Sequence, residues 1–265
     1  MLAVALYKAI KNRKQSKSSE KSHSFQVVSA LHLESHSQNA LFDIPASAPY
    51  LVLAGGVGKL ADYNIYRSFL GQQAARFKKI FLVLGPDEFF GAPVEEGLRT
   101  ARRLTQEPSL KHKLVLLDKG RYDVPDSSIT LLGCTLWSHI PQKNQYVCLE
   151  NVEEFKAIPN WTIHDHNAHY EADASWLRDQ VFRINGESTA KQQRRKILVV
   201  THHLPSISRN LGPENQTEWH SAYATDLLKA NDWDNVDTWA FGHTQYASEV
   251  QEGQVKVLSN QRVRL

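Results

Sequence analysis

The sequence has few cysteines and no long apolar run. Its 265 residues include two cysteines, Cys134 and Cys148, which supply neither a disulfide framework nor a CxxC metal site. This usage favours a reducing compartment, so we expect a cytoplasmic protein. No stretch approaches the roughly 20 apolar residues that a membrane helix needs, and we expect no membrane span.

Three familiar site motifs are also missing. The run Gly55-Gly56-Val57-Gly58 lacks the Lys-Ser/Thr pair of a phosphate-binding loop and the full dinucleotide spacing. No GxSxG turn is present to hold a nucleophilic serine. Hydrophobic residues make up 42% and charged residues 22%, which is ordinary for a soluble globular protein.

Positive charge is concentrated at the start of the chain. The first 21 residues carry a net charge of +5, and because the whole chain carries +3, the remaining 244 residues carry −2. The body is therefore not basic, and we infer no nucleic-acid binding. We predict that residues 1–24 form a basic, disordered head. The alternatives for this head are a weak membrane-surface contact or a targeting segment.

Short apolar runs that stop at glycine or proline predict buried strands. The runs at 50–54 and 80–84 flank a helical pattern over 62–79, which Asp62 is expected to cap, and this β-α-β unit implies parallel strands. The other predicted strands are 25–31, 114–117, 128–132, 197–200, 238–241, 246–250 and 255–258. The other predicted helices are 94–104, 168–184 and 222–230, with irregular segments at 138–168, 185–195 and 206–220.

Five of the predicted strands end in small or polar residues. These ends are 30–34, 54–56, 84–88, 200–203 and 241–245. In open α/β sheets the carboxyl ends of the strands line the ligand crevice, so the five ends are expected to build one site.

Read in order, these five ends resemble the motif blocks of calcineurin-like metallophosphoesterases, which are DxH, GD, GNHE, a histidine block and GHxH. The corresponding blocks are Ala30-Leu31-His32-Leu33-Glu34, Leu53-Ala54-Gly55-Gly56, Gly85-Pro86-Asp87-Glu88, Thr201-His202-His203-Leu204-Pro205 and Phe241-Gly242-His243-Thr244-Gln245. Stretches at 133–139, 161–168, 224–226 and 259–262 resemble a fungal-type branch of that family. The resemblance covers roughly 25–262. It implies one domain over 25–265, a four-layer α/β/β/α sandwich of two mixed sheets.

The resemblance also implies a cofactor. The family holds two divalent metals (Mn, Fe or Zn) about 4 Å apart, which clamp a phosphoryl group and a bridging hydroxide. Two dications 3.5 Å apart repel each other by roughly 19 kcal/mol at an effective dielectric of 20, so an acidic bridging ligand is essential.

Several ligand positions depart from the family pattern. Ala30 replaces the first aspartate, Gly56 the bridging aspartate, Pro86 the asparagine, and Gln245 the second histidine of the last block. By the resemblance, His32 remains for metal 1, and His202 and His243 remain for metal 2. Asp87 stands where the family has a histidine on the leaving-group side. We therefore expect no metal or one weakly bound metal, since metal sites usually need at least three protein ligands.

One alternative ligand set would still hold a single metal. Asp87 with His202 and His243 would form a two-histidine, one-carboxylate set that can hold one metal. The alternative is that Asp87 is a solvated loop residue and that the histidines are structural. The sequence does not decide whether His202 or the adjacent His203 faces the crevice, although the block alignment favours His202.

Other polar residues have simpler interpretations than a metal site. His164, His166 and His169 lie close together, and His166 and His169 share a helix face, but a helix cap by Asp165 or Asn167 is the commoner explanation for such a stretch. Asp226 and Arg262 are interpreted as buried polar partners.

Two functional hypotheses follow. In the first, the chain is a phosphoesterase-domain pseudoenzyme that has lost two-metal hydrolysis and acts as a binding or scaffold protein. In the second, it is a residual single-metal hydrolase that uses His202 and His243 and acts on a phosphoester substrate. Should two metals bind after all, Glu34, Asp87 and Gln245 are the expected replacement ligands. The sequence selects neither a substrate nor an oligomeric state.

Overall fold

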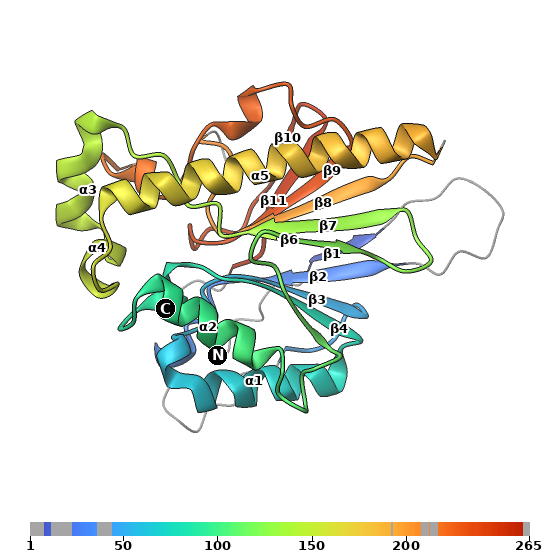
Figure 1. Cartoon of the computed structure of the whole chain (residues 1–265), viewed down its shortest axis with the longest axis horizontal. Helices are drawn as coiled ribbons and strands as arrows, with labels where there is room; N and C mark the ends of the chain where they lie inside the picture. The colour runs from blue at the N-terminus through green and yellow to red at the C-terminus, as the bar shows by residue number, and fades with distance from the viewer. Residues whose placement is uncertain are drawn as a thin grey trace.

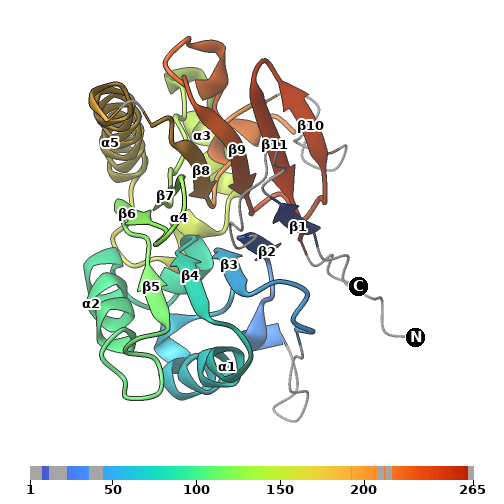
Figure 2. The ribbon, with the colours of Figure 1, turned by 90° about the vertical axis from the view of Figure 1, so that its right-hand side faces the viewer.

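Two mixed sheets pack face to face in the computed structural model, which describes residues 8–11, 23–35, 44–191, 193–207, 212 and 217–261. Helices cover the outer face of each sheet, as the end-on view of Figure 2 shows. The four-layer α/β/β/α sandwich expected from the sequence is confirmed. In the part of the chain that is described, no helix combines the length and apolar character needed to cross a membrane.

The first sheet has five strands in the order β1-β2-β3-β4-β5, all parallel except β1. Its strands are β1 (Lys8–Lys11), β2 (Ser24–Val28), β3 (Tyr50–Ala54), β4 (Lys79–Val83) and β5 (Leu114–Leu116). Helices α1 (Tyr63–Arg76) and α2 (Val94–Leu104) cover its outer face (Figure 1). Because helices lie on one side and the second sheet on the other, β3 and β4 are buried on both faces, as their continuous apolar runs predict.

The second sheet has six strands in the order β10-β11-β9-β8-β7-β6. They are β6 (Gly120–Asp123), β7 (Ile129–Cys134), β8 (Lys196–Thr201), β9 (Val236–Phe241), β10 (Glu249–Glu252) and β11 (Val255–Ser259). The long helix α5 (Ile163–Ala190) covers its outer face (Figure 1). Between the sheets, side chains such as Phe25, Val52 and Phe81 pack against Leu131, Leu198 and Ala240 in one apolar layer.

The second half of the chain differs most from the sequence prediction. The segment predicted to be irregular at 138–168 contains α3 (Gln145–Asn151) and α4 (Glu154–Ala157). Helix α5 begins at Ile163 because Thr162 and Asp165 form a capping box there. It continues to Ala190 and so includes the first part of the loop predicted at 185–195. The helix predicted at 222–230 is replaced by two short 3₁₀ turns, His220–Ala222 and Leu227–Lys229.

Smaller corrections concern single residues and edge strands. Asp62 precedes α1, but its side chain makes no cap hydrogen bond. Phe182 in α5 is 79% exposed, because Val181 and Ile184 occupy the buried face of the helix. Strand β6 was not predicted, and β1 lies inside the basic head, where no regular element was expected. Except for β1 and the two residues 23 and 24, the predicted head lies outside the described residues.

Candidate functional site

The five sequence blocks meet at the carboxyl ends of the strands. The backbone N–H of Ala30 donates to the carbonyl oxygen of Gly55 (3.1 Å), and that of Gly242 donates to the carbonyl oxygen of His202 (3.0 Å). These bonds join the ends of β2 and β3 in one sheet and the ends of β8 and β9 in the other. Residues far apart in sequence are thus assembled at one edge of the sandwich.

His202 and His243 form a directional hydrogen-bond chain. Nδ1 of His202 lies 2.9 Å from the carbonyl oxygen of Ala54, so that nitrogen carries the proton and donates it. Nε2 of His202 therefore accepts, and it lies 3.0 Å from Nδ1 of His243. Burial lowers the pKa of His202 to about 4 and holds the pKa of His243 well below its usual value, so both rings are neutral.

Asp87 does not join these two histidines. Its Oδ2 lies 2.8 Å from Nδ1 of His32, and Oε1 of Glu34 lies 3.4 Å from the same nitrogen. Burial alone would raise the pKa of Asp87, but the hydrogen bond and charge of His32 hold it below the usual value. In the structure, the carboxylate expected to complete a set with His202 and His243 is paired with His32 instead.

Glu88 is a buried structural carboxylate. Its Oε2 accepts from the backbone N–H groups of Gly56 (3.1 Å) and Gly85 (2.6 Å), and its Oε1 accepts from the N–H of Val57 (2.7 Å) and the hydroxyl of Tyr66 (3.2 Å). Burial raises its pKa to about 7, with the Asp87 charge adding to the effect and the backbone donors opposing it. Four donors use the four lone-pair positions of this carboxylate.

The strand ends approach each other too closely for additional side chains. A Cβ at Gly55 would lie 2.2 Å from Nδ1 of His202, and one at Gly85 would lie 2.6 Å from the same ring. Gly56, at the position where the resemblance expects the bridging aspartate, has a φ of +64°, and a Cβ there would lie 3.2 Å from Cα of Ala30. Left-handed φ values and such close contacts favour glycine.

The residues at these positions do not supply the metal ligands that the family uses. Ala30, Gly56 and Pro86 have no side-chain atom that can bind a metal. Gln245 follows the turn after β9, where its backbone N–H donates to Oε1 of Gln261 (2.6 Å). The chain therefore lacks both the acidic bridge and the amide ligand at the positions expected from the resemblance.

Two groups of potential ligands do occur among the described residues. In each group, one ligand atom per residue lies within 4.8 Å of the others. One group is His32, Glu34 and Asp87, and the other is Glu154, His203 and His243. Sequence reasoning left His203 open and missed Glu154, because Glu154 lies in a segment without a strand-end signal.

His166, in the histidine cluster near the start of α5, is packed inside the protein. His166 is buried, with Nε2 lying 3.0 Å from Oγ of Ser138 and its ring packed edge-on against Trp137. Burial lowers its pKa to about 3, so it stays neutral. The capping role expected for Asp165 is confirmed, as the partner of Thr162.

Asp226 is half-buried rather than buried. It accepts from the N–H of Ile207 (2.8 Å) and pairs with Lys229 (2.6 Å). Arg262, which was also interpreted as a buried polar partner, lies outside the described residues.

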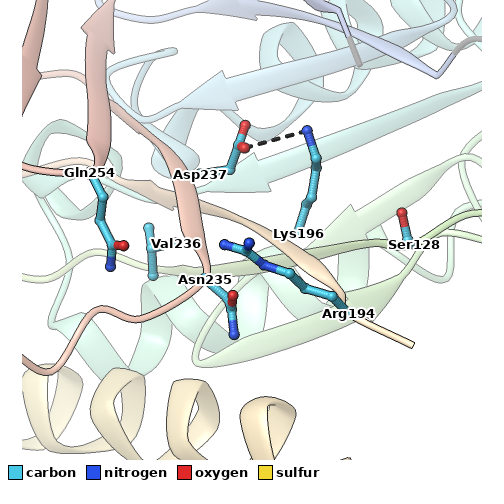
Figure 3. A pocket seen from close by; sticks show the side chains of 7 residues that line it. All are labelled: Ser128, Arg194, Lys196, Asn235, Val236, Asp237 and Gln254. Carbon is cyan, nitrogen blue, oxygen red and sulfur yellow. Dashed lines mark ion pairs between the residues drawn. The ribbon is translucent and has the colours of Figure 1, made fainter. Parts of the chain in front are cut away.

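An open pocket lies at the opposite end of the second sheet. Figure 3 shows Arg194, Lys196 and Asp237 at its edge, with Lys196 Nζ 3.5 Å from Asp237 Oδ1. Lys196 and Val236 begin β8 and β9, whereas His202 and His243 follow the ends of those strands. This pocket is therefore separate from the histidine-lined site.

Comparison with known proteins identifies the fold. No family model matches the sequence, and no curated protein matches it. The crystal structure of phosphopantetheinyl hydrolase (PptH) from Mycobacterium tuberculosis is similar over 90% of this chain and 89% of that chain, with a TM-score of 0.64 and 16% identity.

Two further structures show weaker similarity. A putative 5'-nucleotidase from Staphylococcus aureus is matched over 89% of this chain and 48% of its own length, with a TM-score of 0.48 and 16% identity. A dimetal phosphatase from Danio rerio is matched over 80% of this chain and 72% of its own, with a TM-score of 0.45 and 11% identity. Through the PptH match, the chain has the α/β fold with two mixed sheets of metallo-dependent phosphatases.

Proposed function

We propose that this chain is a calcineurin-like phosphoesterase-domain protein that lacks two-metal phosphoester hydrolysis and acts by binding. The observation that carries the proposal is Gly56. It occupies the position where the resemblance expects the bridging aspartate, and glycine has no side-chain atom that could bridge two metals. Without a bridging anion, two dications at catalytic spacing would repel each other by roughly 19 kcal/mol at an effective dielectric of 20.

A neighbouring carboxylate is not free to replace the bridge. Glu88 lies against Gly56, but its two oxygens already accept from three backbone N–H groups and one hydroxyl. Turning this side chain toward a metal would leave those buried donors unpaired, at a cost of about 1–3 kcal/mol each. The same argument applies less strongly to Asp87, which is paired with His32.

A second candidate is a residual single-metal hydrolase. It is favoured by the 3.0 Å separation of His202 Nε2 and His243 Nδ1, which is a suitable distance for two ligands of one ion. Asp87 would have to leave His32 to complete this set, and the substrate would be a phosphomonoester or phosphodiester.

Hydrolysis assays distinguish the two candidates. With Mn²⁺ or Zn²⁺ present, we expect the purified protein to cleave p-nitrophenyl phosphate and bis-p-nitrophenyl phosphate no faster than a blank containing the same metal, because no acidic bridge is available. His243→Ala, a variant of the central histidine, should give the same rate as the wild-type protein. Clear turnover that His243→Ala abolishes would support the single-metal hydrolase and contradict the proposal.

A further inference from the structure

Glu154, His203 and His243 bring together buried polar atoms that have no hydrogen-bond partner. Among the described residues, these atoms are Oε1 of Glu154, both ring nitrogens of His203 and Nε2 of His243. One ligand atom from each residue lies within 4.8 Å of the other two. Burying a polar atom without a partner costs about 1–3 kcal/mol, so several of them at one place point to a missing ligand.

Three different elements supply this group. Glu154 begins α4, which lies beside the carboxyl ends of the strands, His203 follows β8 and His243 follows β9. The backbone N–H of His203 donates to the carbonyl oxygen of Thr135 (3.1 Å), which fixes the residue in place. His243 is one of the residual metal ligands expected from the sequence, whereas Glu154 lies outside all five sequence blocks.

Aromatic side chains pack against the imidazole rings of His203 and His243. The ring of Trp137 lies 5.5 Å from that of His203, and the ring of Tyr223 packs edge-on against His243 at 4.7 Å, measured between centroids. The two imidazoles lie 4.6 Å apart. Packed rings lose little further freedom when they bind an ion, so the group is already organised.

The hydrogen-bond chain described above sets the protonation state of His243. Because His202 donates from Nδ1 to Ala54, its Nε2 must accept from Nδ1 of His243. His243 is then protonated at Nδ1 and presents a lone pair at Nε2, the nitrogen that has no partner. A metal-bound histidine usually donates its other N–H in this way, which fixes the tautomer and the ring.

We propose that Glu154, His203 and His243 bind one divalent transition-metal ion of the Zn²⁺ type. Two imidazoles and one carboxylate are a common Zn²⁺ ligand set, with bonds of about 2.0–2.2 Å. Such bonds place ligand atoms up to about 4 Å apart, so small side-chain shifts complete the site. A bound cation also supplies the charge that keeps buried Glu154 ionised, whereas burial, with the charges of Asp87 and Glu153 adding to it, raises the pKa of Glu154 to about 8.

This ion would occupy a position different from the one the resemblance implies. That position lies between His202 Nε2 and His243 Nδ1, whereas the proposed ion lies on the Nε2 side of His243. Binding at this position does not depend on hydrolysis. A bound ion without turnover supports both proposals, and absence of the ion leaves the proposed loss of hydrolysis untouched.

The test is a calorimetric titration of metal-stripped protein with Zn²⁺. We expect one ion per chain, and a loss of roughly 10-fold or more in affinity for Glu154→Gln and for His203→Ala, by analogy with the effect of changes around metal ligands. Glu153→Gln is the matched control, because Glu153 is the exposed neighbour of Glu154 and should bind as the wild-type protein does. Asp87→Asn should also retain binding.

Two outcomes would overturn the inference, namely no Zn²⁺ binding and unchanged binding in Glu154→Gln. In the second case, loss of binding in Asp87→Asn would place the ion in the His32 group. Where a variant fails to fold by circular dichroism, X-ray absorption of the Zn²⁺-loaded wild-type protein decides. Scattering from two imidazoles is expected, and scattering from one imidazole or none would contradict the assignment, because the His32 group offers a single histidine.

Discussion

Glu88→Ala is expected to lower the free energy of unfolding by about 3–5 kcal/mol. The substitution leaves the backbone N–H groups of Gly56, Val57 and Gly85 buried without their acceptor, and at the lower end of the range, about 1 kcal/mol each, they already account for about 3 kcal/mol. It also leaves a cavity where the carboxyl group was. Urea denaturation followed by circular dichroism measures the change.

Tyr66→Phe is the matched control for Glu88→Ala. It removes one of the four donors to Glu88 and keeps the buried ring and all three backbone bonds, so we expect a cost of about 1 kcal/mol. Equal effects of the two substitutions would show that the backbone bonds to Glu88 contribute little. In that case Glu88 would be free to act elsewhere in the site.

Gly242→Ala is expected to destabilise the protein by about 3 kcal/mol. The added Cβ would lie 2.3 Å from the carbonyl oxygen of Ala54 and 3.1 Å from Nδ1 of His202. A backbone atom cannot rotate away, so the two sheets must separate locally, and overpacking of this kind is costly. The hydrogen bond between His202 and Ala54 should weaken at the same time.

Gly186→Ala provides the contrasting control. Gly186 lies inside α5 and is exposed, and apart from its chain neighbours and the backbone of its own helix, a Cβ there would have no atom within 4 Å. Alanine favours the helical conformation over glycine, so we expect a gain of about 0.5–1 kcal/mol. Comparison of urea midpoints checks both variants, and a Gly242→Ala midpoint at or above the wild-type value would contradict the close packing of the strand ends.

The fold was largely predictable because its central strands are apolar on both faces. Strands β3 and β4 agree with the predicted runs to within a residue or so, and α2 agrees at both ends. Strand β6 was missed because its sequence, Gly120–Asp123, contains one apolar side chain and lies at the sheet edge. An edge strand that is half exposed leaves little hydrophobic pattern to detect.

The candidate site was predictable only in part. The strand ends could be grouped because parallel strands present their carboxyl ends at one edge. The pairing of Asp87 with His32 was not foreseen, since the sequence gives no distance between the loop of Asp87 and His32. Glu154 could not be found, because only tertiary packing brings α4 against residues that follow β8 and β9.

The account rests on the absence of a two-metal centre, and metal stoichiometry tests this directly. Metal-stripped protein would be titrated with Mn²⁺ by calorimetry, and the number of ions bound per chain would be counted. We predict no more than one. Two tightly bound ions per chain would contradict the account, and the His32, Glu34 and Asp87 group would then be the first place to test for the second ion.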